Sequence, residues 1–263
     1  MNASTMKQWL IREWQVYCLA LMIFTRIPVP QSTPYSEALK NESYKYAGLV
    51  GLLVGGLNAV VYFLAVQLWP IEIAVVLSMM AGIYLTGAFH EDGFADTCDG
   101  FGGGFTPQRK LEIMKDSRVG AYALLGIVMI LLLKYSSLTA LGQFGMSEVM
   151  ISIVLAHILS RTIAVSFIYT HDYVRQTEHS KLKVSPSQHA KRDRDTLLII
   201  ALGSLALLPY WSYAIGIVAF LSITRWLLGR WMVRQVGGYT GDALGATQQI
   251  TEGVCYLYLL VCL

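Results

Sequence analysis

The sequence is poor in charge: Asp, Glu, Lys and Arg make up 14% of its 263 residues, whereas soluble domains carry about 25%. Hydrophobic residues account for 55% and gather in long runs. No internal repeat or low-complexity tract is visible. Together these features exclude an ordinary soluble domain and predict an all-α, polytopic membrane helix bundle.

Cysteine is also scarce, with four residues that show neither C-x-x-C spacing nor a paired His. A zinc site and a disulfide framework are therefore not expected. Cys255 and Cys262 lie seven residues apart on an apolar segment, where we interpret them as packing residues. The net charge of +3 is small, and no nucleic-acid partner is expected.

Seven segments are candidates for membrane spans, and the fifth of them is short. They are residues 46–69, 71–89, 119–141, 147–170, 195–208, 211–228 and 242–263. The apolar run that precedes them, from Trp14 to Phe24, is too short to cross a bilayer. We therefore interpret residues 1–27 as a helix lying at the membrane interface, and residues 1–263 as one integral-membrane domain.

The distribution of Lys and Arg predicts the orientation. Alternating spans place the segments 26–45, 90–118, 171–194 and 229–241 on one side, and these segments are rich in Lys and Arg. The short turns on the other side, near 70, 142–146 and 209–210, contain neither residue. The positive-inside rule makes the charged side cytoplasmic, so 90–118 is a cytoplasmic segment and 171–194 a cytoplasmic loop.

Residues 90–100, His-Glu-Asp-Gly-Phe-Ala-Asp-Thr-Cys-Asp-Gly, place four carboxylates at the end of an apolar segment. On a helix, Asp92, Asp96 and Asp99 share one face at positions i, i+4 and i+7. Three like charges on one stripe repel one another, and a hard cation such as Mg²⁺ would cancel that repulsion. A cation held by carboxylates commonly accompanies a substrate phosphate or diphosphate, which indicates an enzyme acting on such a group.

A basic stretch follows the acidic one. Arg109, Lys115 and Arg118 lie within ten residues of each other, together with Asp116 and Ser117. Arg matches phosphate oxygens bidentately, and Lys supplies a compact point charge. A juxtamembrane basic cluster that touches anionic lipid is the ordinary alternative.

The last candidate span begins with a second polar group. Thr240 or Asp242 can cap the helix, but Asp242, Gln249 and Glu252 also form one stripe about 15 Å long. An acid that deep in a membrane segment normally faces the bundle interior and is functional. Arg161, in another span, either binds a substrate phosphate or pairs with Glu252 or Asp242. Lys134 needs a partner that the sequence does not identify.

Four stretches resemble the cobalamin synthase (adenosylcobinamide-GDP ribazoletransferase) family. They are Phe-Thr-Arg-Ile-Pro-Val-Pro at 24–30, the acidic motif at 90–100, Glu-Ile-Met-Lys-Asp-Ser-Arg-Val-Gly at 112–120, and Gly-Tyr-Thr-Gly-Asp-Ala-Leu-Gly-Ala at 238–246. The resemblance covers residues 21–253. Glu91 departs from the family pattern, in which a Leu is expected.

The resemblance implies a multi-pass enzyme of the bacterial inner membrane with its active site facing the cytoplasm. Such an enzyme joins adenosylcobinamide-GDP to α-ribazole, or to its 5′-phosphate, releases GMP and needs Mg²⁺. Its partners are then these small molecules and membrane lipid, and its oligomeric state stays open.

The resemblance also implies roles for particular residues. Asp92, Asp96 and Asp99 would bind Mg²⁺ with its diphosphate, and Glu91 is a further candidate ligand. Asp116 and Asp242 are alternatives for a metal ligand or for the base that accepts the hydroxyl proton. The candidate substrate-binding residues are His90, Arg109, Lys115, Ser117, Arg118, Arg161, Thr240 and Glu252.

Two other classes of protein share part of the pattern. CDP-alcohol phosphotransferases and aspartate-rich membrane prenyltransferases also break a diphosphate on carboxylate-held metal, but in the former Asp-Gly is followed by Ala-Arg, whereas here Ala95 precedes Asp96. An ion-coupled transporter could use Asp242, Glu252, Arg161 and Lys134 as a relay. No paired repeat halves support a transporter, and the polar motifs lie at one membrane face.

Overall fold

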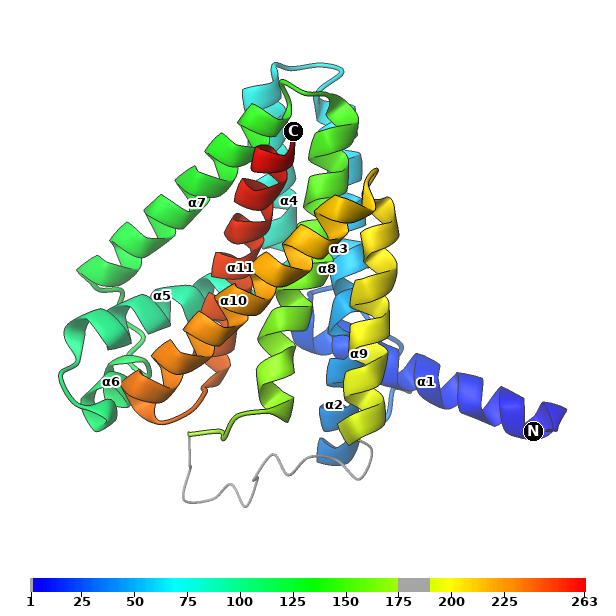
Figure 1. Ribbon diagram of the computed structural model, residues 1–263. Helices are drawn as coiled ribbons and strands as arrows, with labels where there is room; N and C mark the ends of the chain where they lie inside the picture. The colour runs from blue at the N-terminus through cyan, green and yellow to red at the C-terminus, as the bar shows by residue number, and fades with distance from the viewer. Residues whose placement is uncertain (1, 175–189) are drawn as a thin grey trace.

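The computed structural model describes residues 2–174 and 190–263, and these residues form a bundle of α-helices with no β-sheet (Figure 1). The single β-bridge found among them joins Tyr173 to Tyr239. The predicted all-α fold is confirmed. The α-helices are α1 (Ala3–Phe24), α2 (Glu37–Ser43), α3 (Ala47–Ala65), α4 (Ile71–Thr86), α5 (Phe89–Gly103), α6 (Pro107–Ile113), α7 (Ala121–Leu141), α8 (Met146–Ser166), α9 (Ala190–Ser204), α10 (Trp211–Val236) and α11 (Gly241–Cys262).

Four helical stretches of the described chain are long and apolar enough to cross a membrane: Glu37–Ala65, Ala121–Leu141, Met146–Tyr169 and Trp211–Val236. A fifth is obtained if α4 and α5 are counted together. The protein is therefore a multi-pass membrane protein, but the predicted count of seven spans is not reached by this criterion. α9 has only 15 residues, and α11 has a polar N-terminal half that includes Asp242, Gln249 and Glu252.

The second predicted span, 71–89, is wrong in its end point. α4 ends at Thr86, and the chain turns through Gly87 and Ala88, which both have left-handed backbone angles (φ 65° and 59°). α5 then leaves at 89° to α4. The acidic motif is thus helical, as predicted, but its helix lies across the end of the bundle and does not continue the spanning helix (Figure 1).

α8 is the central helix. Of the residues in its most apolar 18-residue stretch, 72% are buried. The corresponding share for α10 is 22%, so α10 lies on the outside of the bundle. α8 packs against both α3 and α11. The approach of α3 is close because Gly51 faces the His157 carbonyl, where a Cβ atom would have no room. Small residues at such contacts let membrane helices approach closely.

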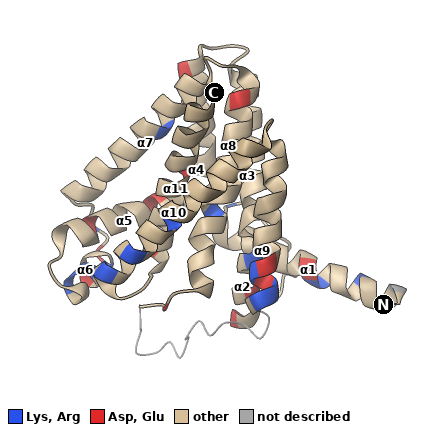
Figure 2. Cartoon of the chain, viewed as in Figure 1, with Lys and Arg blue, Asp and Glu red and all other residues tan. Residues whose placement is uncertain are grey.

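α1 runs sideways from the bundle near the end that carries most of the charge (Figures 1 and 2). The part of α1 next to the bundle is held by Lys45, whose Nζ lies 2.6 Å from Glu13 of α1 and 2.9 Å from Glu42 of α2. Along its free part Trp9, Leu10 and Trp14 are exposed. The position of this helix at the membrane interface stays a prediction.

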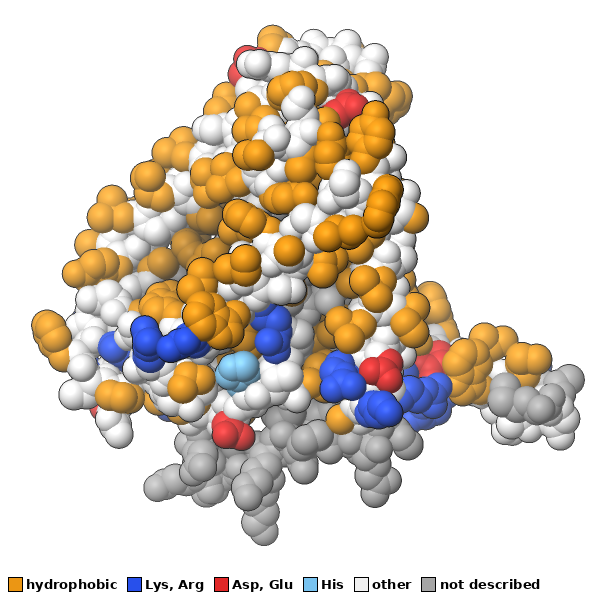
Figure 3. Space-filling model, viewed as in Figure 1, with side chains coloured by type: hydrophobic (Ala, Val, Ile, Leu, Met, Phe, Trp, Pro, Cys, Tyr) orange, Lys and Arg blue, Asp and Glu red, His pale blue; other side chains and the backbone are white. Residues whose placement is uncertain are grey.

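The structure describes only part of the predicted cytoplasmic loop, 171–194. Residues 190–194 belong to α9 and are not loop, and residues 175–189 lie outside the described part of the chain. Lys and Arg gather at the end of the bundle near α2, α6 and the start of α9, while hydrophobic side chains cover most of the rest of the visible face (Figures 2 and 3).

Candidate functional site

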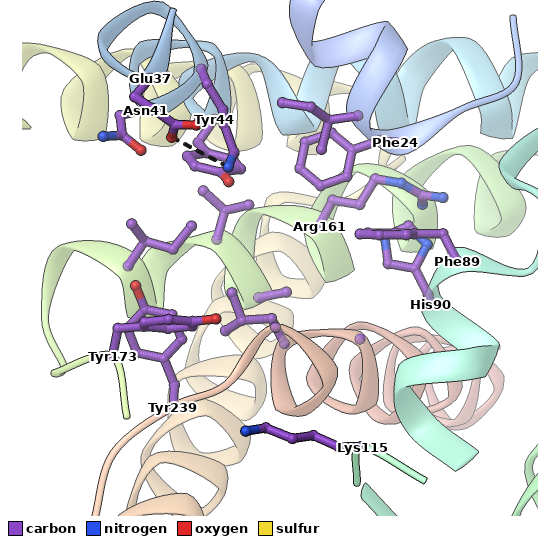
Figure 4. A pocket seen from close by; sticks show the side chains of 18 residues that line it. Phe24, Glu37, Asn41, Tyr44, Phe89, His90, Lys115, Arg161, Tyr173 and Tyr239 are labelled. Carbon is purple, nitrogen blue, oxygen red and sulfur yellow. Dashed lines mark hydrogen bonds and ion pairs between the residues drawn. The ribbon is translucent and has the colours of Figure 1, made fainter. Parts of the chain in front are cut away.

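A cavity of about 460 Å³ lies at the charged end of the bundle, where α1, α2, α5, α8 and α11 meet (Figure 4). Its walls are mostly apolar and aromatic, with a few polar groups, as is usual for small-molecule sites. The lining residues with ionisable or aromatic side chains are Phe24, Glu37, Lys40, Tyr44, Phe89, His90, Lys115, Arg161, Tyr173 and Tyr239.

Three cations among the described residues line this cavity: Arg161 from α8, Lys115 from the chain after α6, and Lys40 from α2, which pairs with Glu37 at 3.4 Å. Arg161 is 3% exposed and donates one hydrogen bond, to the His157 carbonyl at 3.1 Å. Its Nε has no partner, and no ion pair joins it to any carboxylate in the described parts of the chain. A buried guanidinium that no carboxylate contacts directly is costly, so an anionic ligand would stabilise it.

The acidic motif and the motif at 238–246 meet where α5 crosses the start of α11. A Cβ atom on Gly93 would lie 2.9 Å from the Asp242 backbone, and one on Gly245 would lie 3.0 Å from the His90 carbonyl. Only glycine permits this approach. Thr240 caps α11 by accepting a hydrogen bond from the Ala243 amide at 3.1 Å, and Gly241 and Gly245 line the cavity. The helix N-terminus therefore borders the cavity, which favours a bound anion.

His90, the first residue of the acidic motif, lies at the contact with the motif at 238–246. It is buried, and its ring stacks on Phe24 with an interplanar angle of 7°. Phe24 and His90 form the cavity wall beside Arg161 (Figure 4). His90 is thus placed to touch a bound molecule.

The three aspartates of α5 do not share one environment. Asp92 is exposed and Asp96 half-buried. Asp99 accepts hydrogen bonds from the amides of Gly120 at 2.6 Å and Ala123 at 2.8 Å, so it caps the start of α7. Within the described residues no group of three or more His, Cys, Asp or Glu side chains is arranged to hold a metal ion. The predicted three-aspartate ligand set is therefore not preformed, because Asp99 is engaged by the backbone.

Glu91 is directed into the bundle and away from the aspartate stripe. One oxygen accepts a hydrogen bond from Gln249 at 2.9 Å, and the other is buried without a partner. It joins an interior cluster of polar side chains, which we define as Glu91, Lys134, Arg161, Gln248, Gln249 and Glu252. A polar cavity of about 30 Å³, the size of a water molecule or two, lies among them. The structure does not place Glu91 in a metal site.

Lys134 and Glu252 are partners in this interior cluster, 3.1 Å apart and both buried. Glu252 also accepts hydrogen bonds from Gln248 at 2.7 Å and Tyr256 at 3.1 Å. Of the two alternatives for Arg161, an ion pair with Glu252 is thus not formed. Glu252 itself borders only the small cavity, so the structure accounts for it without a substrate.

Most of the predicted basic segment faces solvent. Arg109 pairs with Glu112 at 3.0 Å and Arg118 with Asp116 at 2.6 Å, and Ser117 is exposed. Hydrogen bonds from the Arg118 side chain and amide lower the pKa of Asp116 to about 2. Of this segment only Lys115 lines the large cavity.

Sequence reasoning missed the tyrosines Tyr44, Tyr173 and Tyr239, which border the cavity away from Arg161 (Figure 4). The rings of Tyr173 and Tyr239 are 5.4 Å apart. Tyr239 belongs to the motif at 238–246, which was a usable signal. Tyr44 and Tyr173 reach the site through folding alone, and nothing local marks them.

The fold and the cavity define a class: an all-α, multi-pass membrane protein with a buried arginine and a helix N-terminus facing a cavity of about 460 Å³ at one end. The sequence model of the cobalamin-5-phosphate synthase family matches residues 16–260, and the chain belongs to that family.

Curated relatives are similar along almost the whole chain. An adenosylcobinamide-GDP ribazoletransferase of Shewanella amazonensis is 48% identical over 95% of this chain and 96% of its own length. Proteins of the same name from Shewanella piezotolerans and Vibrio cholerae are 43% and 45% identical, covering 97% and 94% of this chain and 98% and 93% of their own lengths. No solved structure matches the chain.

Proposed function

We propose that this chain is an adenosylcobinamide-GDP ribazoletransferase, which joins adenosylcobinamide-GDP to α-ribazole or its 5′-phosphate and releases GMP. Membership of the family and the shared name of its relatives support the activity. The structural observation that carries it is Arg161, a buried cation without a carboxylate partner that faces a cavity of nucleotide size. The phosphotransferase, prenyltransferase and transporter alternatives are not favoured by the relatives.

The reaction exchanges one phosphorus–oxygen bond for another. A ribose hydroxyl of the ribazole attacks the phosphorus that carries cobinamide, the bridging bond of the diphosphate breaks, and GMP leaves with the bridging oxygen. Such transfers depend mainly on positioning and on neutralising phosphate charge. In our proposal Arg161 and Lys115 supply that charge, and the α11 N-terminus adds to it. The corrin ring is far larger than the cavity, so the cavity holds a nucleotide part of a substrate.

The hydroxyl proton needs an acceptor. Asp116 is unsuited to this task, because Arg118 lowers its pKa to about 2 and so weakens it as a base. We assign the role to Asp242, at the contact between α5 and α11. His90 would contact the bound molecule, and Thr240 would hold the helix start that faces it. Arg109, Ser117 and Arg118, exposed on the same side, could attract anionic substrates from solution.

The proposed cofactor is Mg²⁺. Asp92 and Asp96 lie one helical turn apart, at a spacing that suits a shared ion. Mg²⁺ commonly uses one or two carboxylates and completes its shell with water and substrate phosphates, so these residues fit an ion that arrives with the diphosphate. When bound, the ion would neutralise charge on the diphosphate. Asp99, which caps α7, would position the acidic helix and not bind the ion.

We further propose that the protein lies in the bacterial inner membrane with this site facing the cytoplasm. Lys and Arg gather at the end of the bundle that contains the cavity, as the positive-inside rule requires of a cytoplasmic face (Figure 2). Nucleotide substrates are available on that side.

GMP release by the purified protein tests the proposal. With adenosylcobinamide-GDP and α-ribazole 5′-phosphate, GMP should form in step with the cobamide product, and chelation of Mg²⁺ should stop it. Asp92→Asn and Asp96→Asn should each abolish release while the protein stays folded. Full activity in both variants, or turnover of a CDP-alcohol in place of cobinamide-GDP, would contradict the assignment.

A further inference from the structure

The buried ion pair of Lys134 and Glu252 takes no part in the chemistry proposed above, yet it lies beside Arg161. All three residues are at most 6% exposed and border the same small polar cavity. They come from three helices, α7, α8 and α11. Their charges therefore interact where water cannot screen them.

Glu252 is held by residues other than Arg161, and the His157 ring also lies nearby, with Nδ1 3.8 Å from Oε1. Lys134 lies 3.1 Å from Oε1, the Tyr256 hydroxyl donates to Oε1 at 3.1 Å, and Gln248 donates to Oε2 at 2.7 Å. Lys134 is itself fixed by a hydrogen bond to Gln249 at 2.6 Å. The Glu252 carboxylate is thus held beside Lys134 of α7.

Arg161, in contrast to Glu252 and Lys134, is not held by a charged partner among the described residues. It borders both the small polar cavity and the large one, and its Nε lacks a partner. Without Lys134, the buried carboxylate of Glu252 would need another counter-charge. His157 Nδ1 lies 3.8 Å from Glu252 Oε1 but carries a charge only when protonated, whereas Arg161, which borders the same small cavity, is always a cation. A guanidinium binds a carboxylate in the same bidentate way as it binds a phosphate.

We infer that Lys134 is a positioning residue: by holding Glu252, it keeps the Arg161 guanidinium available for a phosphate group in the large cavity. The inference rests on the proposed function, in which Arg161 binds a substrate phosphate. Lys134 itself lines only the small cavity, so its effect on the substrate passes through Glu252 and Arg161.

Steady-state kinetics on four full-length variants test this role. Lys134→Met should raise the KM of one phosphorylated substrate by about tenfold or more, the usual effect of losing a charged hydrogen bond, with a smaller change in kcat. Lys134→Met/Glu252→Gln removes the competing carboxylate as well, and KM should return to within about threefold of wild type. Arg161→Met should raise the same KM, and adding Lys134→Met to it should change nothing further.

The outcomes separate the two proposals. If Arg161→Met leaves every KM unchanged, both the phosphate role of Arg161 and the inference are wrong. If Arg161→Met raises KM but Lys134→Met does not, or the double variant is as impaired as Lys134→Met, only the positioning role is wrong. Thermal unfolding in detergent checks that each variant is folded. Lys134→Gln, which retains a donor for Gln249, replaces Lys134→Met if that variant does not fold.

Discussion

The charged residues near α6 and those of the interior cluster are paired in different ways. Near α6, cations pair with acids two or three residues away, as Arg118 does with Asp116 and Arg109 with Glu112, and both pairs face solvent. In the interior, Lys134 pairs with Glu252, which is 118 residues away on another helix. Exposed local pairs contribute little to stability, whereas a buried pair becomes costly when one partner is removed. The two regions should therefore respond very differently to substitution.

The largest loss of stability is expected for Glu252→Ala. This change leaves Lys134 buried without its counter-charge and removes acceptors for Gln248 and Tyr256, so the free energy of unfolding should fall by about 3–5 kcal/mol. Chemical unfolding in detergent measures it. Glu112→Ala, at an exposed carboxylate, is the matched control. Equal effects of the two substitutions would remove the distinction between the regions.

Gly93→Ala tests the close crossing of α5 and α11. The new Cβ atom would lie 2.9 Å from the Asp242 backbone, and forcing the helices apart should cost about 1–3 kcal/mol. Turnover should fall as well, because the two motifs would separate. Gly103→Ala is the control, since a Cβ there meets only the end of Ile113 at 3.6 Å. Unchanged turnover in Gly93→Ala would show that the close approach is not required.

Asp99→Ala separates the two roles within the aspartate stripe. Loss of the hydrogen bonds to the Gly120 and Ala123 amides should lower the free energy of unfolding by about 1 kcal/mol. Asp92→Asn, by comparison, should change stability by less than about 0.5 kcal/mol but abolish GMP release. A stability loss in Asp92→Asn that matches Asp99→Ala would contradict this division of roles.

The smallest effect is expected for Arg109→Ala. Its ion pair with Glu112 is 3.0 Å long, but both side chains are more than 60% exposed, so its removal should cost less than about 0.5 kcal/mol. Any decrease in substrate capture should appear in kcat/KM at low salt and vanish at high salt. A salt-independent loss would indicate direct contact with substrate.

Much of the fold was predictable because it depends on local composition. The apolar runs led to a helical membrane bundle, and the short run at 14–24 belongs to a helix, α1, whose place at the membrane interface stays a prediction. The acidic motif is helical, as its spacing indicated. The sequence does not predict the 89° bend before it, because Gly87 falls within a predicted span and only the structure shows its left-handed backbone angle.

The site was predictable in part. The motifs pointed to His90 and Lys115, the charge within a predicted span pointed to Arg161, and all three line the cavity. The motifs gave no means of separating Asp99 from Asp92, because helical spacing places them on one face while the Gly120 amide that engages Asp99 lies 21 residues away. For the same reason the partner of Lys134 could not be identified.

The amino-acid sequence alone determined the helical membrane class, the family and the residue types available for chemistry, because these follow from composition and short motifs. The tertiary structure alone decided which charged groups face one another. Packing of α5, α7, α8 and α11 paired Lys134 with Glu252, directed Asp99 to a helix start and left Arg161 facing the cavity. Electrostatic interactions depend on distance and burial, and in a helical bundle both are set by contacts between segments far apart in the chain.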